Sequence, residues 1–155
     1  MSHLVTATQL ENAVQTARLW LLELDESIVR HRPSVDGWTI AEVIGHLIDS
    51  ACNNHQRFVR AQDEVELVFP KYEQRAWVER SDYANADWQP LVELWYLYNM
   101  QMARIMRAIS SQKLQASCRI GEFKPCTLEF LVTDYLDHLN HHLVKIRKRV
   151  DGVEG

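Results

Sequence analysis

Cysteine is scarce in this chain: Cys52, Cys118 and Cys126 are the only ones, and no two form a Cys-x-x-Cys pair. An odd number without close spacing supplies neither a disulfide framework nor a thiolate zinc site. Glycine and proline are also few, with five and four residues among 155. This shortage favours long regular segments over a turn-rich β architecture.

Long apolar runs and an excess of positive charge are missing as well. No apolar stretch approaches the roughly 20 residues that cross a bilayer, and the N-terminus lacks the basic and apolar regions of a secretory signal. The formal net charge is -4, which argues against a dedicated nucleic-acid binder. We therefore expect a cytoplasmic protein with no membrane or nucleic-acid partner.

What the sequence does contain is helical periodicity. Hydrophobic residues make up 46 % of the chain and charged residues 25 %, as in ordinary globular domains. Apolar residues recur every three or four positions in four segments, the pattern of amphipathic helices. Capping boxes open the first two, at Thr8 with Glu11 and at Thr39 with Glu42. The predicted helices are residues 8–32, 39–62, 87–110 and 127–150.

The connections complete this prediction. Residues 63–86 break the periodicity, with a short helix expected around Tyr72 to Glu79, and a connection of this length is usually functional or a crossover. Residues 111–126 form a second loop. The sequence predicts an all-α four-helix bundle with a long connection between the second and third helices, as a single domain over residues 1–155.

Histidines on the last helix have the spacing of metal ligands. His138 and His142 lie one turn apart, so two imidazoles could bind one ion. On a helical wheel His142 falls about 55° and His138 about 95° from the centre of the apolar stripe, whereas His141 falls about 155° away on the polar face. The alternative is that both are hydrogen-bonded edge residues without metal. Leu139 follows His138, so the glutamate base of the His-Glu-x-x-His metalloproteases is absent.

The other histidines give weaker signals. His46 falls about 130° from the centre of the second stripe, where a surface side chain is the default. His31 and His55 fit no pattern and are expected to be solvated. His3 belongs to a terminus that is expected to be loose.

Three stretches of the chain resemble a known family. GWTIAEVIGHLIDSACNNHQRFVRA, FPKYEQRAW and TLEFLVTDYLDHLNHHLVKI occur in the order and separation typical of the DinB/YfiT-like family of metal-dependent enzymes. The resemblance implies a four-helix bundle that holds one divalent metal ion. The family's ligands fall on His46, on His138 and on His142, and the intervening His141 is not carried over.

The chemistry expected of such a site follows from its ligands. Three neutral imidazoles leave coordination positions open. Imidazole suits zinc, nickel, copper and iron, so the ligand set does not choose between these metals. The expected cofactor is one divalent ion, zinc or nickel first, with manganese or iron as further options. The family includes thiol-dependent transferases and hydrolases, so the resemblance implies a small electrophilic substrate and, for transfer, a low-molecular-weight thiol. A metal-bound thiolate that attacks an electrophilic carbon is the favoured mechanism. The sequence identifies no catalytic residue and no organic cofactor.

Further expectations concern the surroundings of this site. Glu42, Asp49 and Asp134 are spaced so that a carboxylate could accept a ligand imidazole's free N–H. Tyr135 is more typical of a core residue than of a catalytic one. A non-catalytic bundle clamped by metal is the alternative function. A homodimer is expected from the family and from a surplus of aromatic residues, namely Trp20, Trp77, Trp88 and Trp95.

Overall fold

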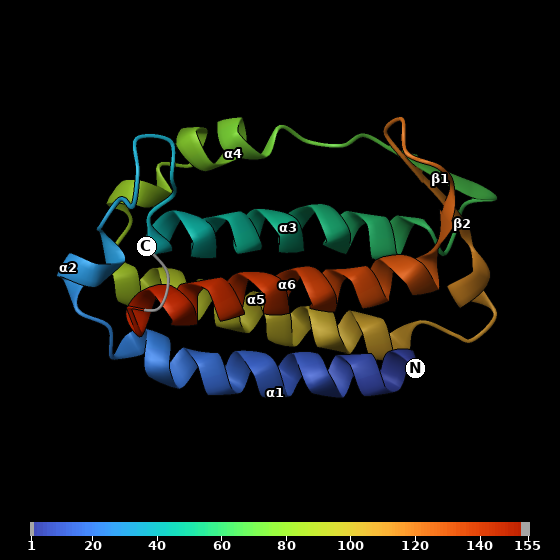
Figure 1. Ribbon diagram of the computed structural model, residues 1–155. Helices are drawn as coiled ribbons and strands as arrows, with labels where there is room; N and C mark the ends of the chain where they lie inside the picture. The colour runs from blue at the N-terminus through green and yellow to red at the C-terminus, as the bar shows by residue number, and fades with distance from the viewer. Residues whose placement is uncertain (1, 153–155) are drawn as a thin grey trace.

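The four long helices predicted from the periodicity form a four-helix bundle in the computed structural model (Figure 1). The structure describes residues 2–152, so Met1 and residues 153–155 of the expected domain lie outside the described residues. The long helices are α1 (His3–Leu22), α3 (Ile40–Arg60), α5 (Trp88–Ala108) and α6 (Leu128–Val150). The fold class is therefore confirmed.

The order of the helices around the bundle explains the long connection. Helices α1 and α6 run in one direction and α3 and α5 in the other (Figure 1). Helix α1 packs against α5 and α6, and α3 packs against the same two. Since α3 and α5 are parallel neighbours, residues 61–87 must return along the whole bundle before α5 can begin. We call residues 61–87 the crossover.

The crossover and the second loop contain strands that the sequence did not reveal. Strand β1 (Glu66–Phe69) pairs in parallel with β2 (Ser117–Ile120), which pairs antiparallel with β3 (Cys126–Thr127). The crossover also holds α4 (Gln74–Arg80), close to the short helix expected there, and the 3-10 turn η1 (Tyr83–Asn85). A second 3-10 turn, η2 (Lys113–Gln115), precedes β2. Strands this short, paired across about 50 residues of sequence, carry no local periodicity.

Helix ends agree with the predicted caps in two cases and differ in one. The Thr39–Glu42 capping box opens α3, and the Thr127 hydroxyl caps α6. The expected cap at Thr8 is wrong, because the Ser2 hydroxyl accepts from the Val5 amide and α1 already begins at His3. His3 is consequently a buried residue of α1 rather than part of a loose terminus. The first segment also ends early, and a separate short helix, α2 (Glu26–Val29), follows.

Helix α3 is buried all round over most of its length. Every residue from Ile40 to Ala51 is buried, because α5 and α6 cover one face while α4, η1 and β1 of the crossover cover the other. At Gly45 the Tyr83 ring lies so close that an added Cβ would be 2.1 Å from ring carbons. Glycine is thus required here for the crossover to pack against α3.

Two of the aromatic residues counted as surplus are core residues. Trp95 is fully buried and Trp88 nearly so, while Trp20 and Trp77 are half-buried. The aromatic argument for a homodimer is weakened accordingly, and the homodimer stays a prediction. Across residues 2–152, the structure contains no helix that is both long enough and apolar enough to cross a membrane.

Replacement of Gly45 by alanine tests the packing of the crossover. In an open helix, Gly→Ala stabilises by about 1 kcal/mol. Here the methyl group would collide with Tyr83, so we expect Gly45→Ala to lower the unfolding free energy by about 1–3 kcal/mol. Chemical denaturation measures this change. In a Tyr83→Ala background the same substitution should no longer destabilise, and stabilisation in both backgrounds would contradict the packing.

Candidate metal centre

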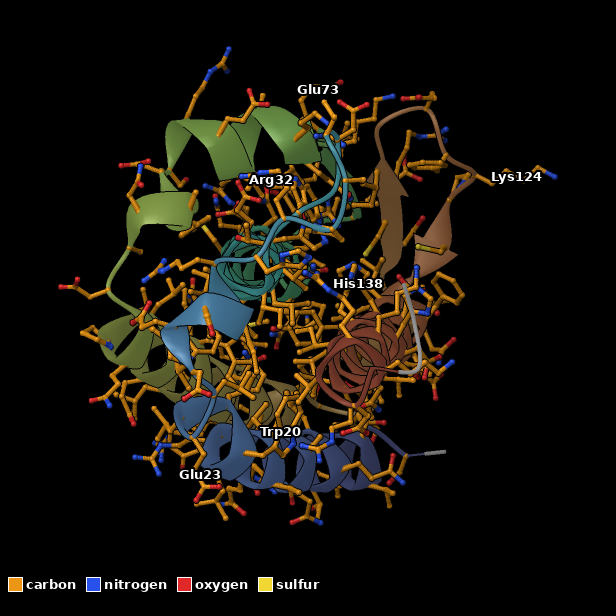
Figure 2. All side chains as sticks on the ribbon, turned by 60° about the vertical axis from the view of Figure 1, so that its left-hand side comes forward. Trp20, Glu23, Arg32, Glu73, Lys124 and His138 are labelled. Carbon is orange, nitrogen blue, oxygen red and sulfur yellow. The ribbon has the colours of Figure 1, made fainter. Side chains whose placement is uncertain are left out.

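Three imidazoles from two helices meet inside the bundle. His46 of α3 and His138 and His142 of α6 each offer a ring nitrogen, and these three atoms lie within 4.8 Å of one another. The Nε2 atoms of His46 and His138 are 3.1 Å apart. Figure 2 shows His138 reaching from α6 into the space between α6 and α3. The structure thus brings together the three residues implied as ligands by the family resemblance.

The spacing fits a common ion. Two nitrogens bound to one zinc ion at tetrahedral angles lie roughly 3.3 Å apart, close to the separation of the His46 and His138 nitrogens. The ring centroids of the three pairs are 4.7, 4.9 and 5.0 Å apart, and each pair is steeply tilted. The rings are therefore not stacked face to face, and each places one nitrogen near a nitrogen of the other two.

Burial keeps these imidazoles neutral. Desolvation, followed by electrostatic interaction with His138 and His142, lowers the pKa of His46 to about 3. Desolvation also lowers the pKa of His142 to about 4, with further contributions from His138, His141 and Lys145. The pKa of His138 is lowered by burial too, although the charge of Asp134 opposes the shift. Neutral imidazole is the form that binds metal.

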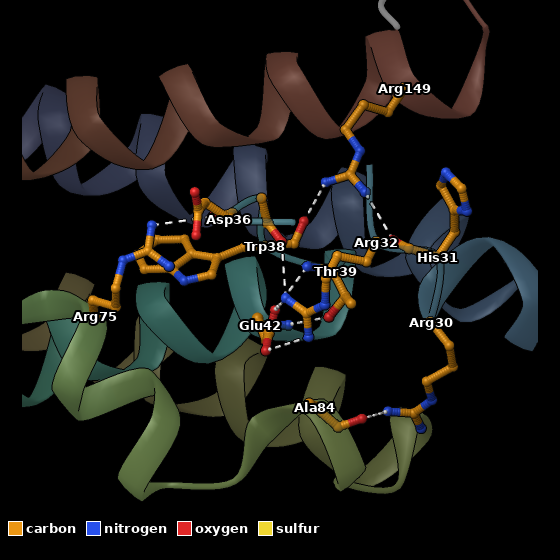
Figure 3. A network of polar contacts seen from close by, with 11 residues as sticks. Arg30, His31, Arg32, Asp36, Trp38, Thr39, Glu42, Arg75, Ala84 and Arg149 are labelled. Carbon is orange, nitrogen blue, oxygen red and sulfur yellow. Dashed lines mark hydrogen bonds and ion pairs between the residues drawn. The ribbon is translucent and has the colours of Figure 1, made fainter. Parts of the chain in front are cut away.

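An aromatic lid covers His46. The Trp38 ring lies 4.9 Å from the His46 ring, centroid to centroid. Arg149 of α6 donates to the Trp38 carbonyl at 3.0 Å, and the Arg75 guanidinium lies 5.9 Å from the centre of the Trp38 ring (Figure 3). Residues from the loop before α3, from α4 and from α6 therefore hold the lid over the buried histidine.

The carboxylates expected beside the ligands bind other partners. Glu42 accepts two hydrogen bonds from Arg32, at 2.9 and 3.0 Å, and one from the Thr39 amide (Figure 3). Asp49 accepts from the Tyr83 hydroxyl at 2.7 Å. The Nδ1 atom of His46 is buried without a hydrogen-bond partner within residues 2–152. The expectation that Glu42 or Asp49 accepts from this imidazole is wrong, since both face the loop or the crossover.

Asp134 is placed differently from these two. Its side chain is exposed on α6 and lines the same cavity as His138. Its charge acts on His138 and counteracts the fall in the pKa of that imidazole. Asp134 therefore lies near the centre as an electrostatic neighbour.

A cavity of about 430 Å³ opens beside His138. Its walls come from α3, from the crossover, from the β2–β3 region and from α6, which makes it a space between elements far apart in sequence. A second cavity of about 260 Å³ lies beside His142 and Trp38. The volume of the larger cavity is that of a small-molecule site.

The remaining sequence candidates are not part of the three-histidine cluster, although the His141 ring lies 5.5 Å from that of His142, centroid to centroid. His141 is exposed, as its place on the wheel predicted, and so is His31. His55 is half-buried and bonded to the Tyr98 hydroxyl at 2.9 Å, so the expectation of a solvated side chain is wrong. Tyr135 is buried and bonded to Asn99, as expected of a core residue. Cys52, Cys118 and Cys126 are free thiols outside the histidine cluster.

Comparison with known proteins agrees with the family resemblance seen in the sequence. Residues 9–146 match the DinB superfamily. The chain is 27 % identical over 115 residues to "Putative metal-dependent hydrolase YfiT" of Bacillus subtilis, and 27 % identical over 110 residues to "Putative metal-dependent hydrolase OB0782" of Oceanobacillus iheyensis. Each alignment covers 71 % of this chain but only 62 % and 63 % of the relatives, so the chain spans about three fifths of their length.

A solved structure has the same architecture. It is described as "YfiT from Bacillus subtilis is a probable metal-dependent hydrolase with an unusual four-helix bundle topology". The superposition has a TM-score of 0.81 at 21 % identity and covers 97 % of this chain and 85 % of that one. At this identity the likeness establishes the fold alone.

The lowered pKa of His46 predicts acid sensitivity of the metal-free protein. The unfolded chain binds this proton near pH 6.5 and the folded chain only near pH 3, so stability is full above pH 6.5 and declines as the pH falls toward 3. Between pH 7 and pH 5 we expect His46 to account for a loss on the order of 2 kcal/mol. Thermal unfolding in the presence of EDTA measures it.

A leucine at this position separates His46 from other acid-sensitive groups. His46→Leu should flatten the dependence of the melting temperature on pH between 7 and 5, because the buried site no longer titrates. His141→Gln, on the exposed face of α6, is the matched control. An unchanged slope in His46→Leu would show that His46 is not held neutral by burial.

Proposed function

Since this chain belongs to the DinB superfamily, we propose that it is a metal-dependent enzyme in which His46, His138 and His142 bind one divalent ion. We further propose that it hydrolyses a small substrate bound in the cavity beside His138. The convergence of three neutral imidazoles next to an open cavity carries the proposal. Both relatives carry the name "Putative metal-dependent hydrolase", which supports the reaction class.

The donor set fits a catalytic ion. Three histidine ligands leave at least one coordination position for substrate or water, as in catalytic zinc sites. The ion would supply Lewis acidity, which polarises a carbonyl or activates a nucleophile. Imidazole suits zinc, nickel, copper and iron, and we propose zinc or nickel.

The protein's own groups provide positioning and proton transfer. His138 is the ligand that also lines the large cavity, so substrate reaches the centre from its side. Trp38 packs against the His46 ring and excludes water from it. Asp134 lies in the cavity lining one turn before His138, where its carboxylate can accept a proton released in hydrolysis.

Thiol transfer, which the family resemblance favours, would use the same three ligands with a thiol as the nucleophile. The names of the relatives support hydrolysis, so we propose hydrolysis first and thiol transfer as the alternative reaction. A non-catalytic metal clamp between α3 and α6 is the alternative from another class. Such a clamp requires an ion whose coordination positions are all filled by protein, whereas cavities adjoin His138 on one side and His142 on the other.

Metal binding is the first test. Titration of EDTA-treated protein with zinc chloride, followed by calorimetry, should give one site per chain. Alanine at His46, at His138 or at His142 should weaken binding at least 100-fold, because two imidazoles cannot replace three. His141→Ala should bind as the wild type does.

The same variants connect binding to stability. At zinc concentrations of about 100 times Kd, binding should add about 2.7 kcal/mol to the unfolding free energy. This gain should vanish in the three ligand variants and persist in His141→Ala. Equal zinc affinity in wild type and His138→Ala would refute the proposed centre.

Activity separates the reaction classes. We expect zinc- or nickel-loaded protein to hydrolyse members of a panel of small esters and amides, with a loss of at least 100-fold in kcat/KM in His138→Ala. A parallel panel of thiols with electrophiles tests transfer. Metal bound tightly without turnover in either panel, together with a large rise in melting temperature, would favour the non-catalytic clamp.

A further inference from the structure

Arg57 occupies an unusual place in the cavity beside His138. It lies three residues before the end of α3, and its side chain lines the cavity and is half-buried. Its Nε atom is buried and has no hydrogen-bond partner among residues 2–152. Within the described part of the chain, no carboxylate approaches this guanidinium to ion-pair distance.

Several other arginines of this protein are paired with acids. Arg18 binds Glu93 at 2.6 Å, Arg32 binds Glu42 at 2.9 Å, and Arg107 binds Glu11. A charge withdrawn from water without such a partner destabilises the folded chain. Desolvation accordingly lowers the pKa of Arg57, while the charges of Tyr72, Cys126 and Asp134 oppose the shift.

The contacts of Arg57 are apolar or distant. Its guanidinium carbon lies 5.5 Å from the centre of the Phe69 ring of β1. Asp134 acts on it electrostatically from the facing helix α6 without forming an ion pair. The guanidinium is thus held over an aromatic ring of β1, and this contact uses none of its N–H donors, which leaves them for a ligand.

The rest of the cavity has the layout of a site for a small amphipathic molecule. His138 lies in its lining together with apolar side chains of Ile120, Phe130 and Leu131. Two lysines also border it, but Lys71 is neutralised by Glu122 at 2.6 Å, and Lys124 extends outward into solvent (Figure 2). Arg57 is therefore the cation best placed to meet a ligand inside.

We propose that Arg57 binds an anionic group of the substrate, a carboxylate or a phosphate monoester, while the reactive part of the molecule points toward His138. This inference rests on the proposed function. The planar guanidinium donates two parallel hydrogen bonds to either oxyanion. The apolar walls hold the body of the substrate, so the substrate class is a small organic acid or phosphate with a hydrophobic moiety.

Binding of simple probes to metal-free protein tests this role of Arg57, which we call the anion anchor. Benzoate, phenyl phosphate and uncharged benzamide are titrated into EDTA-treated protein and followed by shifts of backbone amide resonances. We expect both anions to bind and to shift residues of the cavity, and benzamide to bind at least tenfold more weakly. The stronger of the two anions identifies the preferred head group.

Two substitutions on one helix separate contact from overall charge. Arg57→Gln should weaken binding of both anions at least tenfold. Arg60→Gln removes the same charge from the exposed end of α3 and should leave binding within twofold of wild type. Equal effects of the two substitutions would show that only net charge matters and would overturn the proposal.

Stability distinguishes an anchor from a structural arginine. Arg57→Met keeps the packing of the stem and removes a charge that has no acidic partner, so its metal-free melting temperature should equal or exceed that of wild type while anion binding is lost. A large fall in melting temperature with anion binding retained would assign Arg57 a structural role instead.

Zinc-loaded protein separates this inference from the metal proposal. One outcome is that benzoate binds only when zinc is present, with binding lost in His138→Ala and kept in Arg57→Gln. In that case the assignment of Arg57 is wrong and the metal centre stands. If anion binding depends on Arg57 in metal-free protein while zinc fails to bind, the anchor stands and the metal centre is wrong. If neither benzoate nor phenyl phosphate binds, the assignment of Arg57 as an anion-binding residue is wrong.

Discussion

Helix α3 is enclosed on all sides, and this enclosure determines the properties of the centre. Because α3 and α5 are parallel neighbours, the chain between them must travel back along the bundle, and it does so over the outer face of α3. His46 would otherwise lie near water at the margin of the bundle. With the crossover over α3, Trp38 against its ring and α6 on the other side, it is 1 % exposed. The enclosure thus places an imidazole in a medium where it cannot readily be protonated.

The same enclosure buries polar atoms, and only some of them have hydrogen-bond partners. Glu42 and Asp49 on the covered face have partners from the loop before α3 and from the crossover. His46 Nδ1, Asp49 Oδ2 and Arg57 Nε are buried without partners in the region described. Two of these atoms belong to residues that we assign to ligand binding. Unsatisfied groups destabilise the free protein and are satisfied, or made useful, when a ligand binds.

The sequence predicted best where one side of a helix faces water. Helix α6 has such a side, so the wheel separated His138 and His142 from exposed His141, and the hydroxyls of Thr39 and Thr127 marked helix starts. For His46 the helical wheel wrongly favoured a surface position, because the sequence of α3 does not show that the crossover covers the helix. Only the family resemblance indicated this residue. The pairing of β1 with β2 and the exposure of Arg57 to the cavity depend on contacts between distant segments. Strand β3 has only two residues, so hydrophobic periodicity does not reveal it either.

The walls of the cavity beside His138 come partly from the long helices and partly from the connections between them. His138 and Arg57 project from long helices whose positions are determined by the bundle core. Lys71, Tyr72 and Gln74 come instead from the crossover between β1 and α4, and Phe123 and Cys126 come from the hairpin after α5. Changes in these two connections can reshape the cavity without moving a helix. If the proposed function holds, changes in the two connections would alter which molecules enter the cavity and leave His46, His138 and His142 in place, so that the fold separates selectivity from reactivity.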